Sequence, residues 1–259
     1  MKLQPWVRIG SSVGQDQGTP SVRRAKGNLK SLLRIVFTIF LLGCQIALSH
    51  AQPLEKAPLA GIFLGLQEQI LVANTSAYID QAWNELTRTL KDIPIAVQDI
   101  KIPHDPGKPW PLYISGLEDL KGIQTLLSRT LSSAELSGVE IRTIPDDPDN
   151  IEEHGLLFLP YPYVVPGGRF NEMYGWDSYF ILLGLLASGR IDLAKSIVEN
   201  YLYQIRHYQK ILNANRTYYL GRSNPPFLTR AVLEVFERTK DTAWLKRALP
   251  FLLDHYRFW

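Results

Sequence analysis

The chain has 259 residues, of which 46% are hydrophobic and 20% charged, as in ordinary globular proteins. Its net charge of +3 comes from residues 1–51, which hold seven basic residues and one acidic residue, so the rest of the chain carries a net charge of −3. This distribution argues against a basic nucleic-acid-binding face, and the single cysteine, Cys44, excludes an intrachain disulfide and a cysteine metal site.

The N-terminal region has the pattern of an export signal. Residues 1–30 are polar and rich in Gly and Ser, which predicts disorder. Lys30 and Arg34 then precede an apolar run, Ile35–Leu48, which is short for a transmembrane helix and contains Gln45. We therefore predict a secretory signal peptide and a periplasmic or secreted product.

Two processing sites are compatible with this signal. The small residues Ser49 and Ala51 occupy the −3 and −1 positions of a cleavage site before Gln52. Alternatively, Leu41–Cys44 resembles a loose lipoprotein cleavage box, and a lipid on Cys44 would anchor the mature chain to a membrane. A soluble product is favoured, with the lipid-anchored form as the alternative.

The region 52–155 reads as a mixture of loops and helices. Helical spacing of apolar residues predicts a helix to about Leu90, capped by Thr75 or Ser76. The patterns beyond it predict a loop at Pro103–Trp110, a helix at Gly116–Leu131, a short strand at Val139–Ile141 and a turn at Asp146–Asp149.

From residue 156 on, an extended segment leads into consecutive helices. Prolines 160 and 162 require extended backbone over Leu156–Pro166. Four helices are then predicted, at about Asp177–Ala187 with a C-cap at Ser188-Gly189, at Asp192–Ile211, from Pro225-Pro226 as a first turn, and from Asp241 with a kink at Pro250. Helical hairpins joined by polar loops predict an all-α domain with the architecture of a helical toroid.

Between these regions lies Pro166–Phe180, which reads Pro-Gly-Gly-Arg-Phe-Asn-Glu-Met-Tyr-Gly-Trp-Asp-Ser-Tyr-Phe. Three charged residues, Arg169, Glu172 and Asp177, stand among the aromatic residues Phe170, Tyr174, Trp176 and Tyr179. This combination suits a sugar, because rings cover its apolar CH faces while charged groups bind pairs of hydroxyls. The structural alternative is a helix N-terminus at which Asp177 complements the dipole and the aromatic residues lie in the core.

The run resembles the first signature of the trehalases, inverting glycosidases that split α,α-trehalose into two glucoses. Trp83–Arg88 resembles a second family segment. Asn213 and Arg222–Asn224 match two substrate segments, although Asn224 stands where many trehalases have Gln. The resemblance is close over residues 156–259, faint over 76–90 and absent over 91–155, a stretch that we interpret as an insertion.

The resemblance implies an (α/α)6 toroid that binds the disaccharide trehalose, needs no cofactor or metal, and is a monomer at full length. It assigns substrate contacts to Arg169, Trp176, Asp177, Asn213, Arg222, Ser223 and Asn224. The catalytic pair, an acid Asp and a base Glu, is expected beyond Trp259. Glu172 and Asp177 are a tempting local pair, but their neighbours make hydroxyl binding the better expectation.

A toroid of this class has twelve helices, of which about four follow the signature before the chain stops at Trp259. We therefore interpret the chain as the N-terminal fragment of an exported trehalase, divided into residues 1–51, 52–155 and 156–259. The alternatives are another inverting α-glycosidase of the same toroid class and a non-catalytic sugar-binding remnant. In a partial ring we expect some apolar side chains to lack partners, namely Ile197, Ile205, Leu249, Leu252 and Trp259.

Overall fold

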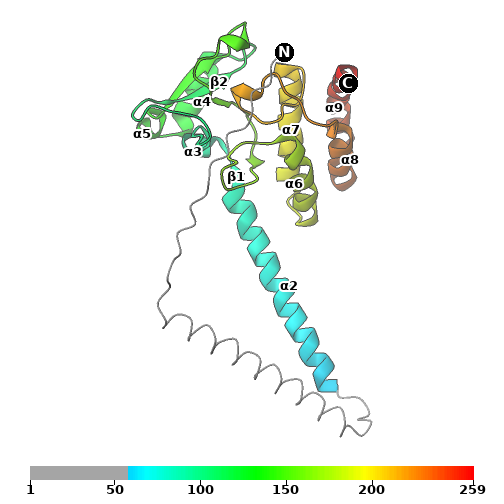
Figure 1. The fold of residues 1–259 in the computed structure, drawn as a ribbon. Helices are drawn as coiled ribbons and strands as arrows, with labels where there is room; N and C mark the ends of the chain where they lie inside the picture. The colour runs from blue at the N-terminus through cyan, green and yellow to red at the C-terminus, as the bar shows by residue number, and fades with distance from the viewer. Residues whose placement is uncertain (1–57) are drawn as a thin grey trace, which may run out of the picture. The chain divides into compact units, whose positions relative to one another are not determined.

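A computed structural model describes residues 58–259 (Figure 1). The chain divides into two compact units, residues 1–69 and 70–259. Of the first unit, the structure describes only residues 58–69, which form the beginning of helix α2 (Pro58–Leu86). The predicted signal peptide, its cleavage site before Gln52 and Cys44 lie outside the described residues. Among the helices of residues 58–259, none combines the length and the hydropathy needed to cross a membrane.

Helix α2 begins well before the predicted cap. Thr75 lies in its interior, where its hydroxyl donates to the carbonyl of Leu71 at 2.8 Å, so the expected cap at this residue is wrong. A threonine that bonds back to the preceding turn is compatible with a helix interior, and the sequence pattern does not distinguish the two roles. At the other end of α2, Trp83 Nε1 donates to the hydroxyl of Ser188 at 3.0 Å and so ties α2 to the end of α6.

A three-stranded parallel sheet contains two strands of the region 52–155, for which one strand was predicted, and a third strand just after it. Its strand order is β3 (Val139–Thr143), β2 (Trp110–Ile114) and β4 (Leu156–Leu157). Leu112 pairs with Ile141 on one side and with Leu156 on the other. Parallel neighbours need a crossover, and helix α4 (Leu120–Thr130) supplies it between β2 and β3, with Ile123 and Leu127 buried in the core beside the sheet.

The sheet confirms one predicted strand and adds others. The strand predicted at Val139–Ile141 is β3, whereas β2 was not predicted. Helix α4 begins later than Gly116, because the side chain of Asp119 accepts a hydrogen bond from the amide of Lys121 and caps it. The sheet also joins residues on both sides of position 155, and the division of the chain at that position stays a prediction.

Short elements complete this region. They are β1 (Thr87–Arg88), which pairs antiparallel with β5 (Tyr163–Val164), the helices α3 (Ile93–Ala96) and α5 (Ser133–Leu136), and the 3-10 turns η1 (Leu90–Asp92) and η2 (Pro148–Asn150). The predicted turn at Asp146–Asp149 overlaps η2, and the predicted extended segment contains β4 and β5.

Four consecutive helices follow, as predicted. They are α6 (Gly175–Ala187), α7 (Ile191–Tyr208), α8 (Leu228–Thr239) and α9 (Thr242–Phe258), with the 3-10 turn η3 (Thr217–Tyr219) in the loop after α7. The C-cap at Ser188-Gly189 is confirmed by the φ of 73° at Gly189, and Asp241 caps α9 through the amide of Trp244 at 2.9 Å. The prolines 225 and 226 precede α8 instead of forming its first turn, because its N-cap is Phe227.

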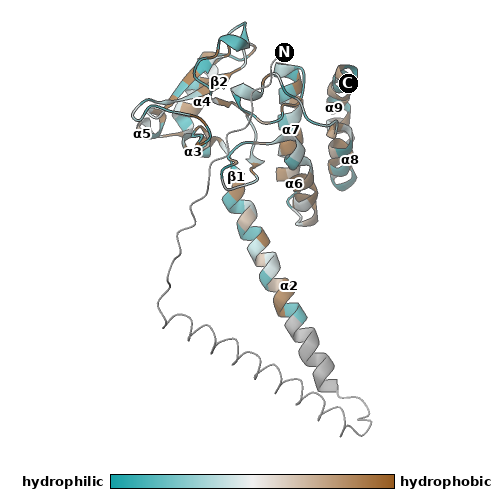
Figure 2. Ribbon diagram, viewed as in Figure 1, coloured by the Kyte–Doolittle hydropathy of each residue, from teal (hydrophilic) through white to brown (hydrophobic). Residues whose placement is uncertain are grey.

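The largest core lies among these four helices. Most of α6 is hydrophobic, whereas α8 and α9 carry both hydrophobic and hydrophilic residues (Figure 2). Ile197 and Ile205, expected on open faces, are buried because α7 packs against α6, α8 and α9. Leu252 is half-buried, and only Leu249 and Trp259 of the five expected residues are exposed.

Candidate functional site

Two glycines make the turn that precedes α6. Gly167 and Gly168 have φ values of 95° and 60°, in the left-handed region that residues with a Cβ seldom adopt. Gly167 and Phe170 exchange backbone hydrogen bonds of 3.2 and 3.1 Å, which close the turn. Arg169 therefore lies in a tight turn, and it is exposed.

The first turn of α6 carries Trp176 and Asp177. The side chain of Trp176 is 45% exposed, and its ring makes an edge contact with Phe227 at 5.1 Å between centroids. Asp177 is half-buried in the same turn, where a carboxylate is stabilised by the helix dipole. An aromatic face and a carboxylate are thus available side by side at the start of the helix.

The loop after α7 pairs with this turn through its backbone. The amide of Gly175 donates to the carbonyl of Asn213 at 3.0 Å, and the amide of Asn213 donates to the carbonyl of Arg222 at 3.1 Å. Leu212 and Ser223 also form an isolated antiparallel bridge. The predicted residues Asn213, Arg222, Ser223 and Asn224 are therefore brought to the start of α6.

A row of aromatic rings connects Arg169 with Arg222. The guanidinium of Arg169 lies 5.0 Å from the ring of Phe170, which makes an edge contact with Tyr174 at 5.5 Å. Tyr174 contacts Tyr219 at 6.1 Å, and the guanidinium of Arg222 lies 5.8 Å from the Tyr219 ring. The two cations, 53 positions apart in the sequence, thus flank one aromatic surface.

Asn224 occupies the tightest place in this loop. Its side chain is buried; Nδ2 donates to the carbonyl of Pro225 at 3.3 Å, while Oδ1 has no hydrogen-bond partner among the described residues. That oxygen lies 2.7 Å from the position that a Cβ on Gly175 would take. Gly175 thus lets the loop approach the first turn of α6, and Asn224 keeps an unpaired acceptor beside it.

Glu172 does not share the surface of the other signature residues. It is completely buried, with Oε1 accepting from Arg216 Nε at 2.9 Å and a second ion pair to Lys101. The expectation that Glu172 binds sugar hydroxyls with Arg169 is therefore not supported. A buried carboxylate between two cations is a structural charge, and Asp177 is the signature carboxylate with access to solvent.

Sequence reasoning missed the partners of Glu172. These are Arg216 and Lys101, and both cations also form ion pairs with a second buried carboxylate, Asp99. Asp99 accepts a hydrogen bond from the hydroxyl of Tyr218 at 2.7 Å. Burial alone would raise the pKa of Asp99, but the Tyr218 hydrogen bond and the charges of Arg216 and Lys101 hold that pKa below its usual value. A lone Arg in a polar loop and an Asp and a Lys far upstream carry no motif that could have identified them.

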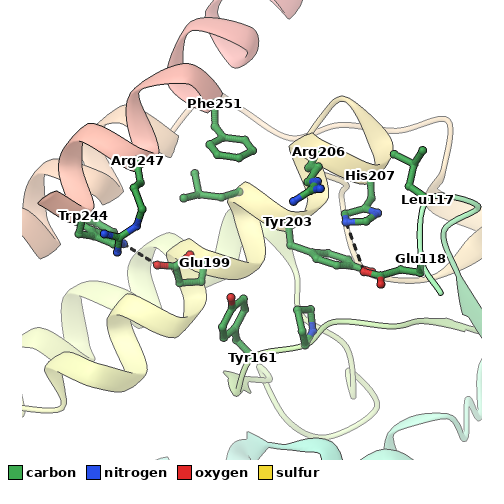
Figure 3. Close-up of a pocket in the computed structure, with 12 residues that line it drawn as sticks. Leu117, Glu118, Tyr161, Glu199, Tyr203, Arg206, His207, Trp244, Arg247 and Phe251 are labelled. Atoms are coloured by element: carbon green, nitrogen blue, oxygen red, sulfur yellow. Dashed lines mark hydrogen bonds and ion pairs between the residues drawn. The ribbon is translucent and has the colours of Figure 1, made fainter. Parts of the chain in front are cut away.

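A separate cavity of about 450 Å³ lies between α7 and α9, lined also by the segments that carry Glu118 and Tyr161 (Figure 3). Trp244 Nε1 donates to Glu199 at 2.7 Å, and His207 Nε2 lies 3.5 Å from Glu118. Burial lowers the pKa of His207, which favours its neutral form. None of the predicted substrate residues lines this cavity, so it is distinct from the cluster at the start of α6.

The family profile and the similar proteins found by comparison all point to the same family. The sequence profile of the family described as Trehalase matches residues 129–259, just over half of the chain. The cytosolic neutral trehalase of Emericella nidulans is 40% identical over 204 residues, covering 68% of this chain and 27% of that protein. The periplasmic trehalase of Xanthomonas campestris pv. campestris is 49% identical over 111 residues, 42% of this chain and 19% of that protein.

Among solved structures, neutral trehalase Nth1 from Saccharomyces cerevisiae is similar to this chain, with a TM-score of 0.57 and 34% identity over 71% of this chain and 37% of that one. Two relatives match 68% of this chain, and the matched part is about 27% of the length of each relative. The family match begins at residue 129, so the likeness extends into the stretch 91–155, and the expectation that the resemblance is absent over all of it is wrong. The interpretation of this stretch as an insertion stays a prediction.

Proposed function

Because the chain belongs to the trehalase family, we propose that the protein of which it forms part hydrolyses α,α-trehalose to two glucoses. Residues 175–258 are the beginning of an (α/α)6 toroid. The observation that carries the proposal is the meeting of two loops at the start of α6. The backbone of Asn213 bonds to Gly175, which directly precedes Trp176 and Asp177, and the aromatic row runs from Arg169 through Tyr174 to Arg222.

The chemistry of this cluster suits a neutral disaccharide. The exposed ring of Trp176 offers a flat apolar face for the CH groups of a pyranose. Asp177 accepts hydrogen bonds from sugar hydroxyls, whereas the exposed guanidinium groups of Arg169 and Arg222 donate to them. In this proposal Asn213, Ser223 and Asn224 complete the hydroxyl contacts from the loop.

For the reaction we propose inversion by an acid and a base. An acid Asp protonates the glycosidic oxygen, and a base Glu activates water from the opposite side, with about 6.5–9.5 Å between the two carboxyl groups. We place this pair beyond Trp259, and the burial of Glu172 between Lys101 and Arg216 supports that choice. Without solvent access, Glu172 cannot exchange a proton with a substrate oxygen.

We also propose export, on the basis of the basic residues before Ile35–Leu48 and the small residues that end at Ala51. The relatives include both a periplasmic trehalase and cytosolic neutral trehalases, so the family alone does not decide the compartment. N-terminal sequencing of the product tests this proposal. A sequence beginning at Gln52, or a lipid on Cys44, supports export, whereas a cytoplasmic product that retains Ile35–Leu48 contradicts it.

Glucose release from trehalose tests the activity. The product of the complete reading frame is assayed beside residues 52–259 alone, with maltose as the control substrate. We expect the complete product to release glucose from trehalose and the fragment to release none. Preference for maltose would favour another inverting α-glycosidase, and a reading frame that ends at Trp259 without activity would favour a sugar-binding remnant.

A further inference from the structure

We propose that Arg216 is a positioning residue that holds the sugar-binding signature in place through Glu172 and joins it to the segment Ala96–Lys101. The effect of Arg216 on trehalose binding rests on the proposed function, whereas the contacts of Arg216 do not depend on it. Neither Arg216 nor any residue of the segment Ala96–Lys101 is among the predicted substrate contacts. Lys101 nevertheless borders the aromatic surface, since its Nζ lies 6.0 Å from the centroid of the Phe170 ring.

Arg216 connects three parts of the chain from a completely buried position. Its Nε donates to Glu172 at 2.9 Å. Its terminal nitrogens donate to three successive carbonyls of the other segment, those of Ala96, Val97 and Gln98, at 2.8, 2.8 and 3.0 Å. The planar fork of a guanidinium can satisfy such a divergent set of acceptors, whereas an ammonium group concentrates its donors on one atom.

The surrounding charges leave this arrangement little freedom. Two buried carboxylates, Asp99 and Glu172, face two cations, Arg216 and Lys101. Lys101 lies within ion-pair distance of both carboxylates, and Arg216 Nε lies 3.6 Å from Asp99 Oδ2. Displacing any member would leave a buried charge unpaired, so the four groups favour one relative position of their backbones.

The backbones so fixed are those that carry the substrate residues. Glu172 lies between Arg169 and Asp177 in the signature. The residue before Arg216, Asn215, accepts from the amide of Met173 at 2.8 Å, so adjacent residues of one loop bind adjacent residues of the signature. Lys101 adds a contact of 3.4 Å to the carbonyl of Arg169. The region before residue 156 therefore takes part in shaping the sugar site.

Arg216 cannot itself touch a substrate at the surface, because it is completely buried and its guanidinium is engaged by protein acceptors. Its effect on sugar binding must pass through Glu172 and the turn before it. A positioning residue therefore differs from an ordinary core residue in the effect of its substitution. Substituting a core residue would destabilise α8 and α9 as much as the signature segment, residues 166–180.

Amide hydrogen exchange on the product of the complete reading frame, without any sugar, tests the structural step. Arg216→Lys keeps the charge but loses the fork, and Glu172→Gln keeps the shape but loses the charge. We expect each to raise exchange in residues 96–101 and 166–177 about tenfold, with little change in α8 and α9. Arg230→Met, which removes an exposed ion pair with Glu234, is the matched control and should leave both segments unchanged.

Kinetics of the complete product on trehalose test the functional step. Loss of a hydrogen bond to a charged group should raise KM for Arg216→Lys by about tenfold, with a smaller change in kcat. The inference would be overturned if exchange in residues 96–101 and 166–177 stayed unchanged, or if it rose equally throughout residues 175–258. Altered exchange in the two segments without a change in KM would also overturn it. If the wild type does not act on trehalose, the proposed function fails, and the exchange experiment alone decides the structural role of Arg216.

Discussion

The amide of Gly175 donates to the carbonyl of Asn213 at 3.0 Å, and this bond seats the loop after α7 on the first turn of α6. The hydroxyl of Tyr201 donates to the carbonyl of Gly175 at 2.8 Å from within the core. Gly175 is thus held on both sides, by the candidate sugar site and by the hydrophobic core. Small changes at this residue should therefore affect binding and stability together.

Substituting Gly175 with Ala should destabilise the protein. The added Cβ would lie 2.6 Å from the carbonyl oxygen of Leu212 and 2.7 Å from Asn224 Oδ1, so the loop must move. We expect the free energy of unfolding, measured by urea denaturation with tryptophan fluorescence, to fall by about 1–3 kcal/mol. Gly221→Ala is the control, since no neighbouring atom lies within 4 Å of its added Cβ. Equal effects of the two substitutions would contradict the proposed close approach.

Arg169→Ala and Asp177→Ala should each weaken trehalose hydrolysis by the complete product. A hydrogen bond to a charged group contributes about 1.5–3 kcal/mol, which corresponds to roughly 10–150-fold in kcat/KM. Because Arg169 is exposed and Asp177 half-buried, the unfolding midpoints should change little. Arg257→Ala, which removes an exposed ion pair on α9, is the control. Wild-type activity in both site variants would leave the signature with a structural role only.

Trp244→Phe should destabilise the contact between α7 and α9. Trp244 is buried, and its indole nitrogen donates to Glu199 at 2.7 Å (Figure 3). Phenylalanine retains a ring but lacks the donor, so we expect a loss of about 1–3 kcal/mol in the free energy of unfolding. The same measurement on Trp176→Phe, at an exposed ring, should give a much smaller loss. A reversed order would show that the bond to Glu199 contributes little.

Stability should fall as the pH is lowered from 7.5 to 5.5. Burial lowers the pKa of His207 and of His255, so in the folded state both favour the neutral form. In the unfolded state they bind protons below about pH 6.5. The two neutral histidines therefore contribute fully to the free energy of unfolding above about pH 6.5. This contribution is lost as the pH falls toward the lower pKa values that the histidines have in the folded state. His255→Gln should reduce the pH dependence of the urea midpoint, and an unchanged slope would contradict this account.

Residues 52–259 expressed alone should aggregate and lack trehalase activity. Helix α9 and the residue after it expose several large apolar side chains, namely Leu249, Leu253, Tyr256, Phe258 and Trp259. Such faces favour association, so light scattering should rise with concentration, and Leu253→Lys should reduce it. A soluble monomer that releases glucose from trehalose would mean that Asp177 takes part in catalysis, and our placement of the catalytic pair would be wrong.

Local signals in the sequence determined the helical region and the turn before it. The C-terminal end of α6 and the start of α9 follow from Gly189 and Asp241, because caps act within one helical turn. The positive φ values at Gly167 and Gly168 follow from the conformational freedom of the residue itself. The unusual order of residues in the signature was enough to indicate the family, to which the chain belongs.

Only the tertiary structure decided which residues lie together. The parallel pairing of β2 with β3 and β4 joins segments whose own patterns do not name a partner. The burial of Glu172 depends on Arg216, 44 positions later, and on Lys101, 71 positions earlier. Periodicity and capping report interactions within a few residues, whereas a buried ion pair forms only where packing brings distant backbones together and excludes water. For that reason the sequence led us to expect hydroxyl binding at both Glu172 and Asp177, whereas the fold buries Glu172 completely and leaves Asp177 half-buried.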